Sequence, residues 1–381
     1  MLFKILRREF FQMLQDPRRI LFLFGVSIIY LIFFELLYLP NTVKKIPLVI
    51  YDAENTKLSR EIVTDFLDSD SFKIVSQTNS EESMMNYLHN KEALAAIEIP
   101  ANFSRQIYLE GSASVLCIID GTNIITTNVI SSSTQEILNA VSEKFAARRL
   151  SLMLGVNENS ALQKISPVTT NLRVLGNPIQ GYLLFFPIGL ALAAFQQGLL
   201  FAVGASVIHE HAEKREFQTW QLLTSKIIFY WCSTFISFVI TILMIEKFRD
   251  LPIRANMSAF LILGGTYAFS IIAFGIFLSS FFNQEVDFIR AVLIYPVPAF
   301  IFSGYAFPTE AMTSSMQLIS KIFPLTWLAN ATRDLLLIGH TAHFEKNIFA
   351  MLIIGTIFLS LTFLAGKFTK KISYKIASAR D

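Results

Sequence analysis

The sequence predicts a membrane α-helical protein with six transmembrane helices, an N-terminal interfacial helix, a re-entrant hairpin before the last helix, and an inserted extracytoplasmic α/β domain. Three observations predict this class. Apolar residues make up 53% of the chain and charged residues only 16%, and the mean hydropathy is +0.51. These values exceed ordinary globular usage. The apolar runs are also unevenly placed: one precedes a mostly polar stretch at residues 40–181, and the others follow it.

Residues 1–19 are predicted to form an amphipathic elbow helix on the inner leaflet, because apolar side chains alternate with Lys4, Arg7 and Arg8. Asp16-Pro17 should end this helix, since proline disfavours helical backbone in the residue before it. The alternative is a merely extended first span. Residues 20–39 match the length of a bilayer core and carry no small-residue cleavage site, which predicts an uncleaved first transmembrane helix.

Residues 40–181 alternate short β-rich runs with helical ones. Strands are expected at 47–52, 72–76, 95–100 and 114–120, and helices at 58–67, 81–89, 102–108 and 123–154. This alternation predicts a small α/β domain with a sheet of about four strands. Asp52 and Asp120 each end a strand, where aspartate commonly forms turns, so we expect the domain to bind or to space rather than to catalyse.

The segment 182–366 holds the other predicted spans, at 182–208, 227–245, 260–282, 291–307 and 348–365. Short segments on one side of these spans carry far more Lys and Arg than those on the other, including the basic tail 367–381. Because such segments stay inside, both termini should be cytoplasmic and the α/β domain extracytoplasmic, in a multi-pass protein of the cell (inner) membrane.

Residues 303–343 are too interrupted by Gly304, Pro308 and Pro324 to form one spanning helix, and they place Arg333 beside Asp334 near membrane depth. Irregular backbone is tolerated there only when it is buried in protein or faces water. A re-entrant helical hairpin entering from outside is therefore predicted. The alternative is an external interfacial helix with a solvated Arg–Asp pair.

Polar groups inside the spans are few, and they are the candidates for a transport pathway, because such groups are costly at membrane depth. They are Glu35, Gln196, Gln197 and Glu246. The two glutamates lie near the ends of their spans and could instead reach the interface. For the two glutamines the alternative is hydrogen bonding between helices.

Several function classes are excluded by what the sequence lacks. No G-x-x-x-x-G-K-[ST] and no H-E-x-x-H is present, so we predict no catalytic, cofactor or metal site, and any ATP energy must come from a partner. Cys117 and Cys232 should lie at different depths and cannot easily pair. A net charge of +3 gives no indication of nucleic-acid binding.

The cytoplasmic segment 209–226 is charged at first and then amphipathic. It resembles the coupling segment of type-2 ATP-binding-cassette (ABC) exporter permeases, and the residues that carry the likeness and the apolar edge are Glu210, Glu216, Thr219, Trp220, Leu222 and Leu223. Gln218 stands where that family usually has glycine, and Lys226 where it has proline. The resemblance implies that this segment docks on an ATP-binding subunit.

The region before the last span is similar to the same family's final signature, through Ser303, Gly304, Pro308, Pro324, Arg333 and Gly339. The insert resembles the external domain of the multidrug-exporter branch, which lies between the first and second spans. These likenesses imply a dimer with a second copy or a paralogue, two cytoplasmic ATP-binding subunits, contact with membrane lipid, and efflux of a lipophilic or amphipathic, drug-like or lipid-like molecule. Involvement of a periplasmic adaptor is left open.

Two other functions stay open at this point. Sodium extrusion would use the same machinery and should depend on Glu35 and Glu246. A non-transporting envelope receptor or organiser would not need the contact made by segment 209–226.

Overall fold

The computed structural model describes residues 2–38, 43–109, 111–155, 157, 185–212, 220–249 and 255–377. It divides into two compact units, one of Met1–Asn41 with Val174–Asp381 and one of Thr42–Arg173. Within the described part of the chain, five helices are long and apolar enough to cross a membrane: Pro17–Leu37, Phe186–Glu210, Leu222–Lys247, Met257–Ser279 and Phe344–Leu364. We call the first unit the membrane unit and the second the α/β unit.

The N-terminal helices are interrupted at the predicted break. Helix α1 spans Leu2–Gln15, and the Asp16 side chain then caps α2 (Pro17–Ile20) by accepting a hydrogen bond from the Arg18 backbone N–H at 3.1 Å. A π-helical turn, η1 (Leu21–Gly25), follows and leads into α3 (Val26–Leu37). The predicted helix boundary at Asp16-Pro17 is therefore confirmed.

Helix α9 (Phe186–Ala212) is the core of the membrane unit and packs against α3, α11 (Met257–Ser279) and α12 (Glu285–Ile294). Its approach to η1 depends on Gly198, because a Cβ there would lie 2.0 Å from the carbonyl oxygen of Phe22. Glycine at such a contact allows two backbones to pack closely. Helix α10 (Trp220–Arg249) packs on α1 and α11.

The run predicted as a fifth span at 291–307 is not one continuous helix. Helix α12 begins earlier, at Glu285, and α13 (Pro296–Phe302) follows it. Proline has no N–H to donate to the preceding turn, which explains the interruption at Pro296. After α13 come η2 (Thr309–Ala311), α14 (Ser314–Ser320), α15 (Pro324–Leu337) and α16 (Phe344–Ala377).

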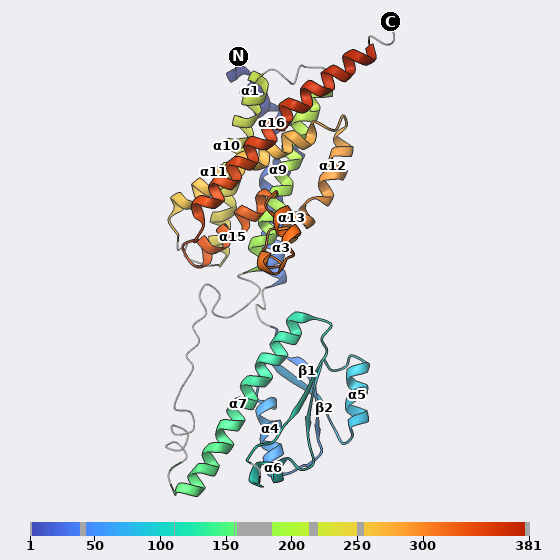
Figure 1. The fold of residues 1–381 in the computed structure, drawn as a ribbon, viewed down its shortest axis with the longest axis vertical. Coiled ribbons are helices and arrows are strands. Elements are labelled where there is room, and N and C mark those ends of the chain that lie inside the picture. Colours follow the sequence, from blue (N-terminus) through green and yellow to red (C-terminus); the bar gives the residue numbers. More distant parts are fainter. Residues whose placement is uncertain are drawn as a thin grey trace. The chain divides into compact units, whose positions relative to one another are not determined.

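Helix α15 is buried within the membrane unit, where it contacts α9, α11, α13 and α16. Leu325, Leu328 and Leu335 are among its buried side chains. Helix α14, by contrast, exposes Leu318 and Ile319. Figure 1 shows α1 near one end of this unit and α13 and α15 near the other.

The α/β unit contains a four-stranded sheet of order β2-β1-β3-β4. Its elements are β1 (Ile46–Asp52), α4 (Lys57–Leu67), β2 (Phe72–Thr78), α5 (Glu81–His89), β3 (Ala95–Ile99), α6 (Phe103–Leu109), β4 (Leu116–Ile119) and α7 (Ile124–Leu154). Strand β1 runs parallel to β2 and β3, and β4 runs antiparallel to β3. The strands and helices expected from the alternating pattern are present.

The two faces of this sheet are covered differently. Leu48 and Ile50 point toward the larger core, which α4, α6 and α7 complete with side chains such as Phe66, Phe103 and Phe145. Val49 lies on the opposite face with Met84 of α5. Figure 1 shows α7 running along one side of the sheet and α5 on the other. Alternate strand residues therefore bury both faces, as the period of two requires.

Candidate functional site

A buried cluster of charged side chains lies where α1 packs against α9 and α10. Arg8 and Glu9 come from α1, Ser206 and Glu210 from α9, and Lys226 from α10. Glu9 points inward because it lies one turn from Ile5 and one turn from Met13, on the apolar face of α1. The amphipathic pattern of α1 thus carries a carboxylate into the protein interior.

Lys226 is the centre of this cluster. Its ammonium donates hydrogen bonds to Glu9 Oε1 at 2.7 Å, to the backbone carbonyl of Ser206 at 3.2 Å and to the Ser206 hydroxyl. That hydroxyl in turn donates to Glu9 Oε2 at 3.0 Å. Both Glu9 oxygens and the ammonium are therefore satisfied within the protein, as a buried ion pair requires.

A second ion pair adjoins the first. The Arg8 guanidinium donates a hydrogen bond to Glu210, and the Lys226 ammonium lies 3.8 Å from the same carboxylate. Glu9 and Glu210 have no exposed side-chain surface and Lys226 has 1%, whereas Arg8 keeps 28%. Two carboxylates therefore face two cations, and the cluster is neutral. This balance lets formal charges stay buried at the junction.

The pKa of Glu9 responds to two opposing effects. Burial alone raises the pKa of this carboxyl. The pKa is lowered by the charge and hydrogen bond of Lys226, by the hydrogen bond from Ser206 and by the charge of Arg8, and these effects together outweigh burial. The pKa of Glu9 is held below its usual value, so the group is ionised at neutral pH.

Four of the six predicted ATPase-coupling residues lie in the described part of the chain. Glu210 belongs to it, and α10 begins at Trp220. Glu216 and Thr219 lie outside the described residues. Leu222 and Leu223 are buried in the apolar core of the membrane unit. Their burial follows from their place at the start of α10, one turn before Lys226.

The predicted pathway residues occupy different environments. Gln196 is fully buried, and its side-chain oxygen accepts a hydrogen bond from the Tyr267 hydroxyl of α11 at 3.1 Å. This bond joins two helices, which is the alternative role considered for it. Gln197 and Glu246 are half-buried, and Glu35 on α3 is buried. Among the described residues, no three His, Cys, Asp or Glu side chains gather as they would around a metal ion.

The predicted signature residues at 303–339 shape the turn between α13 and α15. Ser303 is buried, and its carbonyl accepts a hydrogen bond from the Asn330 side chain at 2.8 Å. Gly304 and Gly339 adopt positive φ, of 78° and 96°, which glycine allows without strain.

The other three signature residues follow. Pro308 precedes η2, and Pro324 begins α15. The Arg333 guanidinium lies over the Tyr305 ring at 5.2 Å and contacts Asp334 at 3.4 Å.

Arg8 and Glu9 were missed as site residues, and Lys226 was noted only as a substitution for proline. One signal was present for Glu9. It is the only acid in the first 15 residues, and it falls where the apolar face of α1 calls for an apolar residue. An acid at such a position indicates a buried partner.

These features define a multi-pass membrane protein with a buried ionic junction among its helices. Residues 18–364 match the family described as ABC-2 family transporter protein, so the chain belongs to that family. Two of its relatives are proteins of Escherichia coli, from strains K12 and O157:H7, each named probable multidrug ABC transporter permease YbhR. Each is 23% identical over 346 residues, which cover 88% of this chain and 89% of the relative.

A more distant relative is ABC transporter G family member 20 of Dictyostelium discoideum. It is 26% identical over 116 residues, which cover 30% of this chain and 16% of that protein.

Proposed function

We propose that this chain is a permease subunit of an ABC exporter that moves a lipophilic or amphipathic molecule out of the cell. Membership of the ABC-2 family supports the permease role, and the name of the Escherichia coli relatives supports a multidrug type of cargo. Because the sequence contains no P-loop motif, ATP hydrolysis is assigned to a partner subunit. The chain itself is then a transport permease and not an enzyme.

The buried cluster is the observation that carries the coupling part of this proposal. Glu210 and Lys226 bracket segment 209–226, on which we propose that the ATP-binding subunit docks. Lys226 pairs with both Glu9 and Glu210, and these contacts tie the end of α9, the start of α10 and helix α1 together. A push on the segment would then move three helices as one body, in a hinge or shear motion, instead of bending a single loop.

The remaining architecture is proposed as follows. Helices α12 and α13 together form a fifth span, which makes six, and residues 303–343 form the re-entrant hairpin. Both termini are cytoplasmic, and the α/β unit is extracytoplasmic. A second copy or a paralogue completes the pathway at a dimer interface surrounded by lipid, with a periplasmic adaptor as an additional partner to be tested.

The proposal is tested by charge reversal in the docking segment. In cells that express the exporter with its ATP-binding partner, Glu216→Lys should raise the accumulation of lipophilic dyes to the level of cells that lack the permease, and should abolish co-purification of the ATP-binding subunit. The matched control is Glu345→Lys, which reverses an exposed acid at the start of α16. Normal dye efflux and co-purification with Glu216→Lys would overturn the docking assignment.

A further inference from the structure

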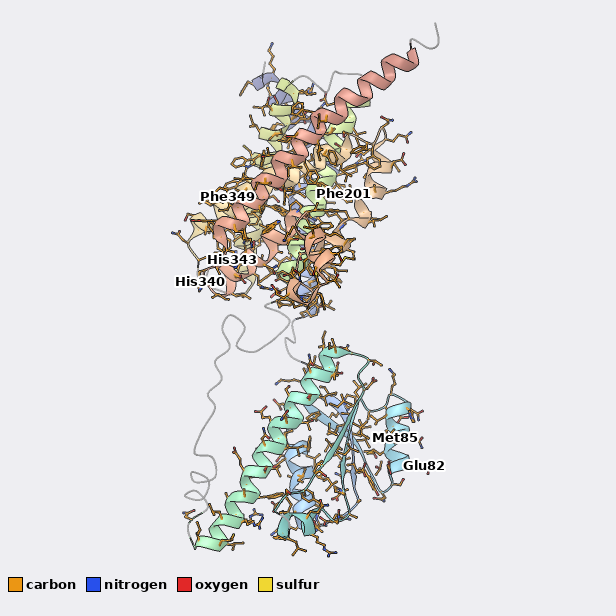
Figure 2. The ribbon with its side chains drawn as sticks, viewed as in Figure 1. Glu82, Met85, Phe201, His340, His343 and Phe349 are labelled. Atoms are coloured by element: carbon orange, nitrogen blue, oxygen red, sulfur yellow. The ribbon has the colours of Figure 1, made fainter. Side chains whose placement is uncertain are left out.

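A cavity of about 840 Å³ lies inside the membrane unit, between the turn that follows α13, helix α15 and the start of α16. Neither the proposed coupling junction nor the candidate pathway residues contribute to it. Figure 2 labels one of its lining residues, His343, near the start of α16. A volume in the range of small-molecule sites, lined by both charged and aromatic groups, is typical of a ligand pocket.

The charges around the cavity favour an anion. Its lining includes the cations Lys321, Arg333 and Lys346 and the acids Glu310 and Asp334, and it also includes His343. Of the three cations, only Arg333 makes an ion pair with another described residue, a 3.4 Å contact with Asp334. The two lysines are exposed and have no such carboxylate partner among the described residues.

Arg333 is held in place by aromatic rings. Its guanidinium lies 5.2 Å from the centre of the Tyr305 ring and 5.7 Å from that of Phe185, and the two rings stack with their centres 4.9 Å apart. Tyr305 is itself fixed, because it is 2% exposed and its hydroxyl donates to the Phe185 carbonyl at 2.6 Å.

Cation–π contact orients the plane of the guanidinium and leaves its N–H edge for other partners. Among the described residues, the single hydrogen bond that Arg333 donates is the one to Asp334, at 3.4 Å, which is long for a charged pair. A planar guanidinium presents two parallel N–H groups that match a phosphate or carboxylate. Trp327, which also lines the cavity, adds an apolar surface beside this charged group.

We infer that this cavity binds the anionic headgroup of an amphiphile, with Arg333 as the bidentate contact and Lys321 and Lys346 as flanking cations. The inference deepens the proposed export function, on which it rests for the idea that amphiphiles reach this site from the membrane. It assigns a negative charge to the molecules that are recognised there. The anionic phosphate of a phospholipid is the simplest example of this chemistry.

The indole of Trp327 allows binding to be measured in the full-length protein. In nanodiscs, a variant with Trp220→Phe and Trp231→Phe keeps Trp327 as its one tryptophan. Brominated phosphatidylglycerol should quench its fluorescence at concentrations about tenfold lower than brominated phosphatidylcholine does, because only the first lipid carries net negative charge. Equal quenching by the two lipids would overturn the inference.

Arg333→Gln should remove this preference for the anionic lipid. The matched control is Arg290→Gln, since Arg290 also contacts an acid, Asp287, at 3.4 Å but does not line the cavity. Should Arg333→Gln fail to fold, Lys346→Gln at an exposed position should reduce the preference about threefold while keeping the fold. An unchanged preference in the folded Arg333 variant, or in the Lys346 variant, contradicts the assignment.

A further measurement distinguishes a lipid headgroup from a free anion in the cavity. Inorganic phosphate, added at the concentration of the brominated lipid headgroups, should leave the quenching of Trp327 unchanged, because it lacks an acyl chain. Relief of quenching by phosphate would overturn the amphiphile assignment in favour of a small-anion site. Binding is measured without ATP or a partner subunit, so normal dye efflux with Glu216→Lys, which would overturn the docking assignment, does not affect this result.

Discussion

The ammonium of Lys226 lies 2.7 Å from a carboxylate oxygen of Glu9, and neither side chain exposes more than 1% of its surface. The two residues are 217 positions apart in the chain. Their contact joins the first helix to the start of α10, beside the segment on which we propose that the ATP-binding subunit docks. An ion pair in this position makes the relative placement of these helices sensitive to a single charge.

The first prediction concerns the loss of one member of this pair. Lys226→Met should lower the free energy of unfolding by about 3–5 kcal/mol, because it leaves Glu9 buried without its main cation. Thermal unfolding of the purified protein in detergent measures the effect. The double variant Glu9→Leu with Lys226→Met should regain most of the loss, since the remaining pair of Arg8 and Glu210 is still neutral.

Lys144→Met provides the control, because it breaks an ion pair with Asp65 in which the lysine is 58% exposed. Its cost should stay below about 1 kcal/mol. Similar losses for Lys144→Met and Lys226→Met would show that the buried cluster contributes no more than a surface pair.

The second prediction concerns pH. The pKa of Glu9 in the folded protein is below its usual value of 4.5. The stabilisation from this group is therefore complete above that value and is lost as the pH falls through the lower folded-state pKa. Glu9→Gln should make stability fall less steeply as the pH is lowered. Thermal unfolding measured between about pH 7 and about pH 3 checks this expectation. An acid limb that is the same in both proteins would contradict the assignment.

The third prediction tests the close packing of α9 on η1. Gly198→Ala should destabilise the membrane unit by about 1–3 kcal/mol, because the added Cβ would lie 2.0 Å from the Phe22 carbonyl oxygen. Gly121→Ala serves as the control, since a Cβ there meets nothing within 4 Å. Thermal unfolding compares the two, and equal stability of both variants would mean that η1 moves aside without cost.

The fourth prediction decides between two roles for Gln196. Tyr267→Phe removes the 3.1 Å hydrogen bond to its side chain and should cost about 1 kcal/mol of stability, while dye efflux is retained. Tyr108→Phe, at a tyrosine that is 65% exposed, should change neither quantity. Lost efflux with unchanged stability would instead place Gln196 in the transport pathway.

Local patterns in the sequence predicted the α/β unit well. Its strands are short runs of apolar residues bounded by turn formers, so periodicity alone locates them. Asp52 was expected to form a turn, and its carboxylate accepts hydrogen bonds from the backbone N–H groups of Glu54 and Asn55. Asp120 does the same for Thr122 at 2.9 Å. Each of these features depends on residues close together in the chain.

Two features could not be predicted in this way. The partners of Glu9 come from helices far along the chain, and no periodicity pairs one charged residue with another over such a distance. The start of α12 was also missed, because Glu285 and Asp287 interrupt the apolar pattern although acids are favourable in the first turn of a helix. Hydropathy measures how apolar a segment is, but it does not detect the favourable effect of acids in the first turn of a helix.

The π-helical turn η1 should allow the first membrane-length helix to tolerate the loss of one residue. A π turn accommodates one residue more than an α turn does over the same rise. Deleting one residue from Leu21–Gly25 should therefore let the backbone return to ordinary α winding, while Arg19 before it and Leu31 after it keep their buried orientations. Within α3 itself, a one-residue deletion would rotate every later side chain by about 100° around the helix axis.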